Sequence, residues 1–437
     1  MRHEQASRAV LPLTSAGVFV FFATMFAVPS GYSIGGTLLL LASLLWLAQC
    51  PRLDTLRSQD HWMIVVLLIY SIVSSAMILW LGNTPKYIDQ FSRALLAIPV
   101  FLLLLHVRVS LPMIWAAIAL GVTLSAPLAW WQINMQHMDR AAGFLNIIHF
   151  SNLALVFVIY CAAGLYWAGA QGRHARRWQA GFLLAIACGL YSVIVGGSRS
   201  SWVALPPVIV VFLIAFMTRR NIGRLTIAAA ASVLVVGGLF AVPDSPLQVR
   251  YAAAVKDITL YQEDQPDSSI GARFEMWRGA LHNLEREPIL GWNLQAYTQA
   301  LQDQVARGEL APVALAFNNN LHNNYIHAWV FTGLPGLLAL LALYGLPLWH
   351  FARRLRDADL TARVLAFCGA STVVSYLCFG LTQVILQRNN GIMFYLLAIM
   401  ILWGALRHAS TSCSCSTPCT MPQAADRSSS PTCNQRS

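Results

Sequence analysis

Residues 111–131 read LPMIWAAIALGVTLSAPLAWW and contain no charged side chain. A helix needs about 20 apolar residues to cross the hydrocarbon core of a bilayer, and this run is long enough. Inside lipid the backbone N–H and C=O groups have no water to bond, so the run must pair them internally as a helix. Similar runs recur along the chain. The sequence therefore predicts an all-α integral membrane protein.

The composition agrees with this prediction. Hydrophobic residues make up 57% of the 437-residue chain and charged residues 11%, with a mean hydropathy of +0.58. An ordinary globular domain has about 25% charged residues, so this chain has too few to solvate a surface. The net charge of +11 would suit nucleic acid, but the basic residues are spread over many short loops and form no continuous patch. We therefore expect membrane lipids, and no nucleic acid, as partners.

Twelve apolar runs are candidates for membrane-spanning helices. The expected spans are 11–29, 33–50, 61–82, 90–107, 111–131, 146–170, 178–196, 201–217, 225–242, 326–350, 362–386 and 391–407. The first run follows Arg2 and Arg8 and could be a signal peptide, but it is long for one and lacks a small-x-small cleavage site. We therefore keep it as a span, and the even number of spans puts both termini on one side.

Basic residues in the short loops set the orientation, because Lys and Arg are enriched in the cytoplasmic loops of membrane proteins. One set of alternate loops holds Arg52, Arg57, Arg108, Arg173, Arg176, Arg177, Arg219, Arg220, Arg224, Arg353, Arg354, Arg356 and Arg363. The other set of loops has very few Lys or Arg residues. The sequence thus predicts a multi-pass protein of a bacterial inner membrane, with both termini cytoplasmic and residues 242–325 in the periplasm.

We expect four parts along the chain. Residues 1–241 form a bundle of about nine spans, 242–325 a periplasmic loop or lid, 326–408 the last three spans and 409–437 a cytoplasmic tail. The tail is rich in Ser, Thr, Pro and Cys and has no apolar period, which predicts disorder. Its Cys residues leave a zinc site open, although no Cys-x-x-Cys spacing supports one.

The nearly bare outward loops still hold a few cations, which oppose the usual charge bias. They are Lys86, Arg93, Arg140, Arg199 and Arg388. Each alone could be an anchor for lipid head groups. Together they favour an outward pocket for an anionic, phosphate-bearing ligand, because the arginine fork donates paired hydrogen bonds to phosphate oxygens. Arg199 lies in the sequence GGSRSSW (196–202), where Ser200 or Ser201 could cap a helix whose N-terminus would also favour an anion.

The long loop has two segments that could contribute to such a pocket. Residues 271–281 read as an amphipathic helix, because Phe274, Trp277, Leu281 and Leu284 recur at three- and four-residue spacing, which suits a membrane surface. Arg273 of this helix could face either the pocket or the surface. The loop ends in NNNLHNNYIH (318–327), where His322 could exchange a proton near neutral pH or simply cap the next helix.

A zinc site at this end of the loop is a poor alternative. His322 and His327 are five residues apart, unlike the i,i+4 spacing of His-Glu-x-x-His. Asn ligates zinc badly. His327 and His149 lie within apolar runs and are better read as packed helix residues. The sequence therefore predicts no metal site here.

Three short motifs give the chain a resemblance to a known family. They are Ser-Arg-Ser at 198–200, Arg-Phe-Glu-Met-Trp at 273–277 followed by Pro288-x-x-Gly291, and His322-Asn323 followed by Gly333-x-x-Gly336. In this order and spacing, over nearly the whole chain, the sequence resembles the O-antigen ligases, in the larger family that also holds O-antigen polymerases and protein O-oligosaccharyltransferases.

This resemblance implies a GT-C-like membrane glycosyltransferase of about 12 transmembrane helices with one large periplasmic helical loop, acting without a metal or other cofactor. It implies an undecaprenyl-diphosphate-linked O-antigen as donor and lipid A–core as acceptor, with Arg199 and Arg273 on the diphosphate and His322 at the acceptor. Five further residues are candidates for substrate binding: Lys86, Arg93, Arg140, Arg388 and Asn323. Glu275 could share the role of base. A polymerase, a protein O-oligosaccharyltransferase and, less readily, a transporter remain alternatives.

Overall fold

A computed structural model describes residues 2–49, 51, 55–219, 221–223, 237–238, 242, 246–263, 265–316 and 319–414. In these ranges the regular secondary structure is entirely helical, which confirms the predicted all-α membrane fold. The expected ninth span, 225–242, lies almost entirely outside the described residues, as does the tail after residue 414. The last helix extends to Ser414, past the residue at which the tail was expected to begin.

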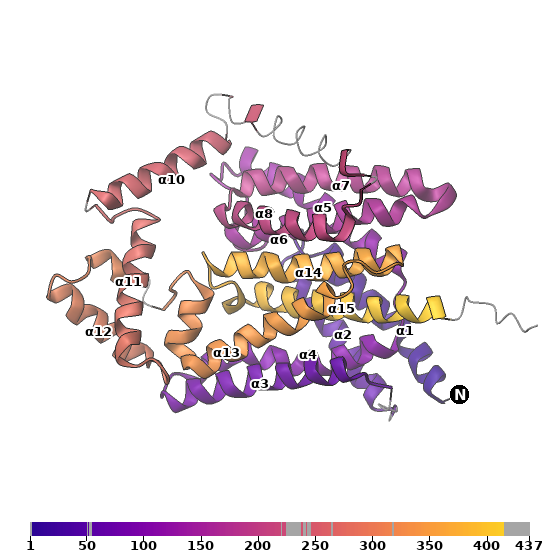
Figure 1. Ribbon diagram of the computed structural model, residues 1–437, viewed down its shortest axis with the longest axis horizontal. Helices are drawn as coiled ribbons and strands as arrows, with labels where there is room; N and C mark the ends of the chain where they lie inside the picture. The colour runs from indigo at the N-terminus through magenta and orange to yellow at the C-terminus, as the bar shows by residue number, and fades with distance from the viewer. Residues whose placement is uncertain are drawn as a thin grey trace, which may run out of the picture.

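Eleven of the twelve expected spans coincide with helices. They are α1 (Arg2–Ala23), α2 (Gly31–Leu47), α3 (Ser58–Trp80), α4 (Asp89–His106), α5 (Leu111–Asn134), α6 (Ile147–Gly169), α7 (Ala175–Gly196), α8 (Arg199–Phe216), α13 (Asn324–Ala352), α14 (Leu360–Gly380) and α15 (Asn389–Ser414). Within the described residues, nine helical segments are long and apolar enough to cross a membrane, and α1 and α2 contribute shorter apolar helices. The spans lie side by side as one bundle (Figure 1).

The boundaries differ from the prediction most clearly at α14. The apolar run suggested a span to residue 386, but the helix ends at Gly380, and a loop with the short 3-10 helix η4 (Ile385–Gln387) follows. Val384 and Leu386 of this loop are buried against other parts of the protein, which accounts for their apolar side chains outside a helix. Hydropathy alone cannot distinguish such a loop from a helix end.

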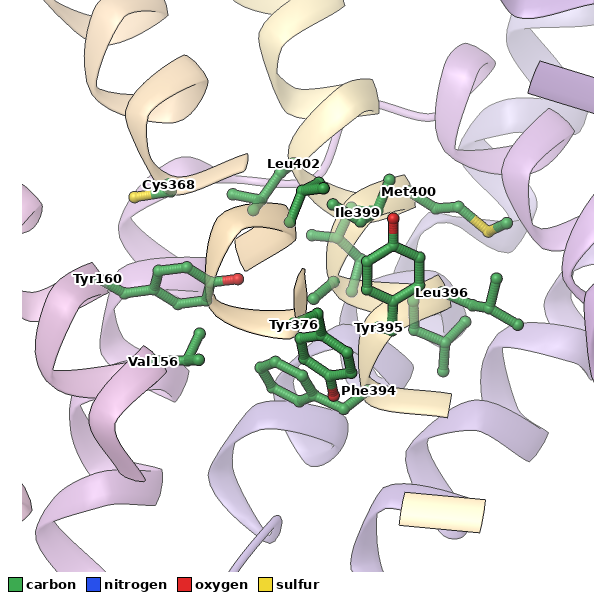
Figure 2. Close-up of a cluster of buried hydrophobic side chains, with 14 of the residues drawn as sticks. Val156, Tyr160, Cys368, Tyr376, Phe394, Tyr395, Leu396, Ile399, Met400 and Leu402 are labelled. Carbon is green, nitrogen blue, oxygen red and sulfur yellow. The ribbon is translucent and has the colours of Figure 1, made fainter. Parts of the chain in front are cut away.

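The centre of the bundle is made by α6, α14 and α15, which are the most buried of the described spans. Aromatic side chains from these helices meet there, including Tyr160, Tyr376 and Tyr395 (Figure 2). Their hydroxyl groups are paired: Tyr160 with Thr372 at 2.5 Å, and the other two with backbone carbonyls at 2.8 and 2.9 Å. Because a polar group without a partner is costly inside a membrane, these bonds let the core contain tyrosine.

The lid forms a second, smaller unit beyond one end of the bundle (Figure 1). It consists of α10 (Pro246–Gln262), α11 (Gly271–Arg286), α12 (Leu294–Ala306) and η3 (Pro312–Leu315). Its own core gathers around Ala272, Met276, Ala280 and Leu284 of α11. The expected membrane face was wrong in part, because Leu284 is 3% exposed and packs in this core, whereas Leu281 is 47% exposed. Small residues such as Ala272 and Ala280 let α11 pack closely on its neighbours, and a hydrophobicity pattern weights them too little.

A backbone joint fixes the lid to α13. The helix is broken at Gly333, whose φ of 64° and ψ of −176° lie outside the helical range. The backbone groups freed by this break bond to the Pro288–Trp292 turn: Trp292 N donates to Val330 O at 2.6 Å, and Leu334 N donates to Ile289 O at 2.8 Å. The two glycine motifs of the sequence thus form the two halves of one joint.

The other end of the bundle carries the chain ends and many of the cations. The start of α1 and the last described turn of α15 lie at the end opposite the lid (Figure 1). Arg407 bonds there to the buried Asp60, and Arg354 pairs with Asp357 at 3.0 Å. The predicted orientation, with both termini cytoplasmic and residues 242–325 in the periplasm, stays a prediction.

Candidate active site

A polar cleft lies where the lid meets the bundle. It encloses about 610 Å³ of space, part of it open to solvent. Its lining residues are Arg140, Ile148, Gly197, Ser198, Arg199, Ser200, Ser269, Arg273 and Thr382. Ser269 and Arg273 come from the lid, and the others come from the bundle. Three of the arginines singled out in the sequence therefore share one cleft.

The α7–α8 turn places Arg199 at the cleft. Gly197 ends α7 in the left-handed conformation, with φ 57°. Arg140 holds this turn: its Nε and Nη2 donate to the carbonyl of Gly196 at 2.9 and 2.7 Å, and Nη2 also donates to that of Gly197 at 2.9 Å. A cation that bonds the last carbonyls of a helix stabilises that helix end. Arg140 thus both lines the cleft and positions Arg199.

The first turn of α8 is anchored to α6. Ser200 and Ser201 each donate from Oγ to Asn152 Oδ1 at 2.8 Å. The expectation that one of these serines caps α8 was wrong, because Ser198 is the N-cap and makes no side-chain cap bond. Asn152 lies in an apolar run, so its hydrogen bonds to Ser200 and Ser201 could not be predicted from the sequence. The N-terminus of α8, which favours anions, opens toward the cleft.

Arg199 also connects the bundle to the lid. Its Nη1 donates to Asp257 Oδ2 of α10 at 3.2 Å. The pKa of Arg273 is lowered by burial first and by the charge of Arg199 second, whereas Asp257 raises it. An arginine stays charged despite such a shift. The cleft therefore holds two guanidinium groups near one carboxylate, a net positive site for an anion.

His322 lies beside this cleft in a constrained conformation. Its φ is 48°, in the left-handed region that a non-glycine residue seldom adopts. The backbone N–H donates to Asn320 Oδ1 at 3.0 Å, and Nδ1 lies 2.7 Å from Gln383 Oε1. An amide oxygen can only accept, so Nδ1 carries the proton and the lone pair of the neutral ring is on Nε2.

The electrostatic surroundings keep His322 neutral. Its pKa is lowered by burial and by the charge of Arg273, while the hydrogen bond to Gln383 raises it by less than burial lowers it. A neutral imidazole at neutral pH can accept a proton. Thr382, next to Gln383, lines the cleft itself. The geometry therefore combines fixed cations for an anion with a candidate general base.

Comparison with known proteins shows what this chain is similar to. A family model described as O-antigen ligase matches residues 180–341, which run from α7 through the lid into α13. An O-antigen ligase of Escherichia coli is 25% identical over 222 residues, covering 51% of this chain and 50% of that protein. The part of the chain from α7 into α13 is thus similar to the O-antigen ligase family. An uncharacterized protein of Haemophilus influenzae is 26% identical over 386 residues, covering 88% of this chain and 96% of its own.

Two further residues of the motifs noted in the sequence hold the His322 segment in place. Trp277 Nε1 donates to Leu321 O at 2.8 Å, so the motif helix α11 fixes the residue before His322. Asn323 Oδ1 accepts from the backbone N–H groups of Tyr325 and Ile326 at 3.0 and 3.1 Å. The capping role considered for His322 therefore belongs to Asn323, for which the structure gives a structural role rather than a place in the cleft.

Glu275 lies inside the lid. Its Oε1 accepts from Tyr261 at 2.9 Å, and Oε2 accepts from the backbone of Ala311 at 2.8 Å, so it ties α10, α11 and the η3 segment together. Its contacts among the described residues therefore lie within the lid, and a share in the role of base stays a prediction. Arg278, on the same helix, has a side chain that is 62% exposed.

The remaining cations of the outward loops do not line the cleft. Lys86 and Arg388 are exposed, and Arg93 pairs with Asp89 at 2.5 Å and borders an apolar groove between α2, α4 and α15. The positions of these cations in the sequence predicted that they lie in outward loops, but could not predict whether their side chains reach the cleft. Conversely, Asp257, Thr382 and Gln383 could not be predicted as site residues, because no sequence motif contains them. Their places at the site depend on contacts between segments that are distant in the chain.

Proposed function

We propose that this protein transfers an O-antigen glycan from undecaprenyl diphosphate to a sugar hydroxyl of lipid A–core, completing lipopolysaccharide at the periplasmic face of the inner membrane. The observation that carries the proposal is the cleft in which Arg199 and Arg273 face a common space beside His322. A diphosphate is the anion that such a pair of guanidinium groups suits best.

The arginines act on the leaving group. As the bond between the anomeric carbon and the diphosphate oxygen breaks, negative charge grows on that oxygen. Fixed guanidinium groups directed at it stabilise the transition state more than the ground state. In this proposal Arg199 and Arg273 supply the charge that a divalent ion provides in other transferases, so the reaction is metal-independent.

His322 acts on the acceptor. The acceptor hydroxyl attacks the anomeric carbon from the face opposite the diphosphate, its proton passes to Nε2, and undecaprenyl diphosphate leaves. One bond forms as another breaks, so the anomeric configuration inverts. A single displacement needs one base and no covalent intermediate on the protein.

A test of the donor site uses two variants of one helix. Arg273→Ala is expected to lower kcat/KM by about 100-fold or more, because a fixed charge at the leaving group is lost. Arg278→Ala is the matched control, since it removes an exposed arginine five residues along α11 and should change kcat/KM little. Equal activity of the two variants would remove Arg273 from the diphosphate site.

Arg199 is tested by a conservative change. Arg199→Lys keeps the charge but loses the planar fork, so transfer should fall by about tenfold or more, and Arg199→Ala should fall further. Both proteins should still insert into the membrane. Full activity of the lysine variant would argue against bidentate recognition of phosphate.

An O-antigen polymerase is the nearest alternative, because it uses the same donor. A deletion strain separates the two by the lipopolysaccharide it makes. Loss of a ligase leaves bare core and an accumulating lipid-linked polymer, whereas loss of a polymerase leaves core bearing a single repeat unit. Turnover of a lipid-diphosphate glycan by pure protein without an ion gradient would exclude a transporter, and absence of glycoprotein products would exclude a protein O-oligosaccharyltransferase.

A further inference from the structure

A second cavity lies near His322, apart from the arginine cleft. It encloses about 670 Å³ of space, part of it open to solvent, and is formed by α3, η1 (Pro85–Ile88), the start of α4, α13 and the loop after α14. Figure 1 shows α13 and α3 side by side, and their residues are in contact. Because the cavity is partly open, a polar group of a substrate can enter it from outside.

The lining of this cavity is largely apolar and aromatic, carries several amide side chains and is uncharged. Amide side chains come from Asn83, Gln90, Asn319, Asn324 and Gln387, and rings come from Tyr70, Tyr87, Phe91 and Phe331. The described residues that line it include no Lys, Arg, Asp or Glu. Amides both donate and accept hydrogen bonds, as sugar hydroxyls do, and aromatic rings pack against the apolar C–H face of a sugar. The arginine cleft has the opposite character.

Three buried polar atoms of the lining lack a partner among the described residues: Ser74 Oγ, Asn83 Nδ2 and His327 Nδ1. Ser74 and Asn83 are 1% and 8% exposed. A buried donor or acceptor without a partner costs about 1–3 kcal/mol, so such groups normally meet a bonding partner. A lipid chain could not supply one. Hydroxyl groups of a bound sugar could bond all three.

The cavity and the arginine cleft share the segments that hold His322. Asn319 and Asn324, on either side of His322 in the chain, line the cavity. In the other segment, Thr382 lines the cleft, Gln383 bonds His322, and Val384, Leu386 and Gln387 line the cavity. A group bound in the cavity therefore lies close to the two segments that hold the proposed base.

We propose that this cavity binds the terminal sugar of the acceptor and selects an uncharged one. The inference rests on the proposed function, because it gives the cavity the acceptor of that reaction. Burying a carboxylate or phosphate among neutral groups leaves a charge without a counter-ion, which is costly. An acceptor that ends in a neutral hexose is thus admitted, and one that ends in an anionic sugar is rejected.

The first test compares two acceptors with full-length protein in nanodiscs. One is a lipid A–core whose terminal sugar is a neutral hexose, and the other is the same molecule ending in the corresponding hexuronic acid. Binding is measured without donor, and transfer is measured with donor. We expect the neutral acceptor to bind about tenfold or more tightly and to give the larger kcat/KM. Equal binding of the two acceptors would overturn the inference.

The second test removes the buried polar groups one at a time. Asn83→Asp keeps the side-chain oxygen that accepts from Leu294 N at 2.9 Å but loses the amide donor, and Ser74→Ala removes one hydroxyl. Each should raise the acceptor KM and Kd about fivefold or more while the donor KM stays unchanged. Ser371→Ala is the matched control, because Ser371 Oγ is also buried without a partner among the described residues but does not line the cavity.

Different results would contradict the proposed function and the assignment of the cavity to the acceptor sugar. If transfer is absent with every acceptor, the proposed function fails, while selective binding of the neutral glycolipid that Asn83→Asp and Ser74→Ala weaken would still support the cavity assignment. If transfer occurs but neither variant changes the acceptor KM or Kd, the cavity assignment fails and the proposed function stands.

Discussion

At the scale of single residues, the conformation of His322 distinguishes it from the other histidines near it. A non-glycine residue in a sparsely populated backbone region costs about 1–3 kcal/mol and persists where its surroundings hold it. Here the bonds to Asn320 and Gln383 and the neighbouring cap at Asn323 hold it. Such fixed side chains suit a general base, whose ring must meet the acceptor hydroxyl in one orientation.

The pH dependence of transfer follows from the state of His322. Since its pKa lies below the ordinary value of 6.5, the neutral base persists into mildly acidic solution, and kcat/KM should fall only as the pH drops through that lowered pKa. Gln383→Glu would put a carboxylate against Nδ1 and favour the charged ring, so the acid limb should move to higher pH.

The control for this pH measurement is Gln299→Glu, the same change at an exposed position of α12. It should leave the acid limb where it is in the unchanged protein. A Gln383→Glu limb that stays in place or moves to lower pH would show that His322 is not the group whose protonation limits the rate.

At the scale of elements, α11 does more than carry Arg273. Through Trp277 it holds Leu321, a buried residue adjacent to His322. Trp277→Phe would keep most of the ring but leave that carbonyl without its donor. We expect kcat to fall by about 10–100-fold with little change in the donor KM, because a small misplacement of the His322 ring is enough to slow proton transfer. Kinetics of purified protein measure this.

The comparison for Trp277 is Trp349→Phe, at the opposite end of the bundle, where Trp349 packs against Arg353. This variant should retain the kcat of the parent protein. If both tryptophan variants lose activity equally, or if only the donor KM changes, Trp277 does not position the base.

The glycine joint between lid and α13 gives an independent prediction on stability. A Cβ at Gly291 would lie 2.5 Å from Val330 O, one at Gly333 would lie 2.5 Å from Ile289 O, and both residues have positive φ. Gly291→Ala or Gly333→Ala should therefore destabilise the protein by about 1–3 kcal/mol or more and lower its Tm. Gly345→Ala is the control on the same helix, because nothing lies within 4 Å of its Cβ.

At the same scale, the sequence predicted most of the membrane spans but not all of their boundaries. Eleven spans were identified because a bilayer imposes one length rule on every apolar run. The end of α14 was missed because Val384 and Leu386 are buried by packing and not by lipid. The buried face of α11 was partly misassigned because small residues such as Ala272 and Ala280 do the packing.

The candidate site shows the same limit. Short motifs indicated Arg199, Arg273 and His322, and Arg140 could be placed only on the outward side. Their partners could not be foreseen: Asp257 is 58 residues from Arg199, and Gln383 is 61 residues from His322. Contacts of that separation depend on the folded arrangement of lid and bundle, which local patterns do not contain.

At the scale of the whole molecule, the position of the cleft explains how two lipid-borne substrates could meet. The cleft lies at the seam between the lid and the bundle, while the start of α1 and the last described turn of α15 lie at the other end (Figure 1). In the proposed orientation the seam faces the periplasm near the membrane surface. Under the two proposals, the diphosphate would enter at the arginine cleft and the acceptor sugar at the neutral cavity, with His322 close to both.

The most direct test of the central claim is transfer by the purified full-length protein in lipid nanodiscs, with undecaprenyl-diphosphate-linked glycan and lipid A–core, in excess chelator. We predict lipopolysaccharide formation at an unchanged rate with chelator, and none above background with His322→Ala. A reaction that stops on adding chelator, or that His322→Ala carries out at a near-normal rate, would contradict the account.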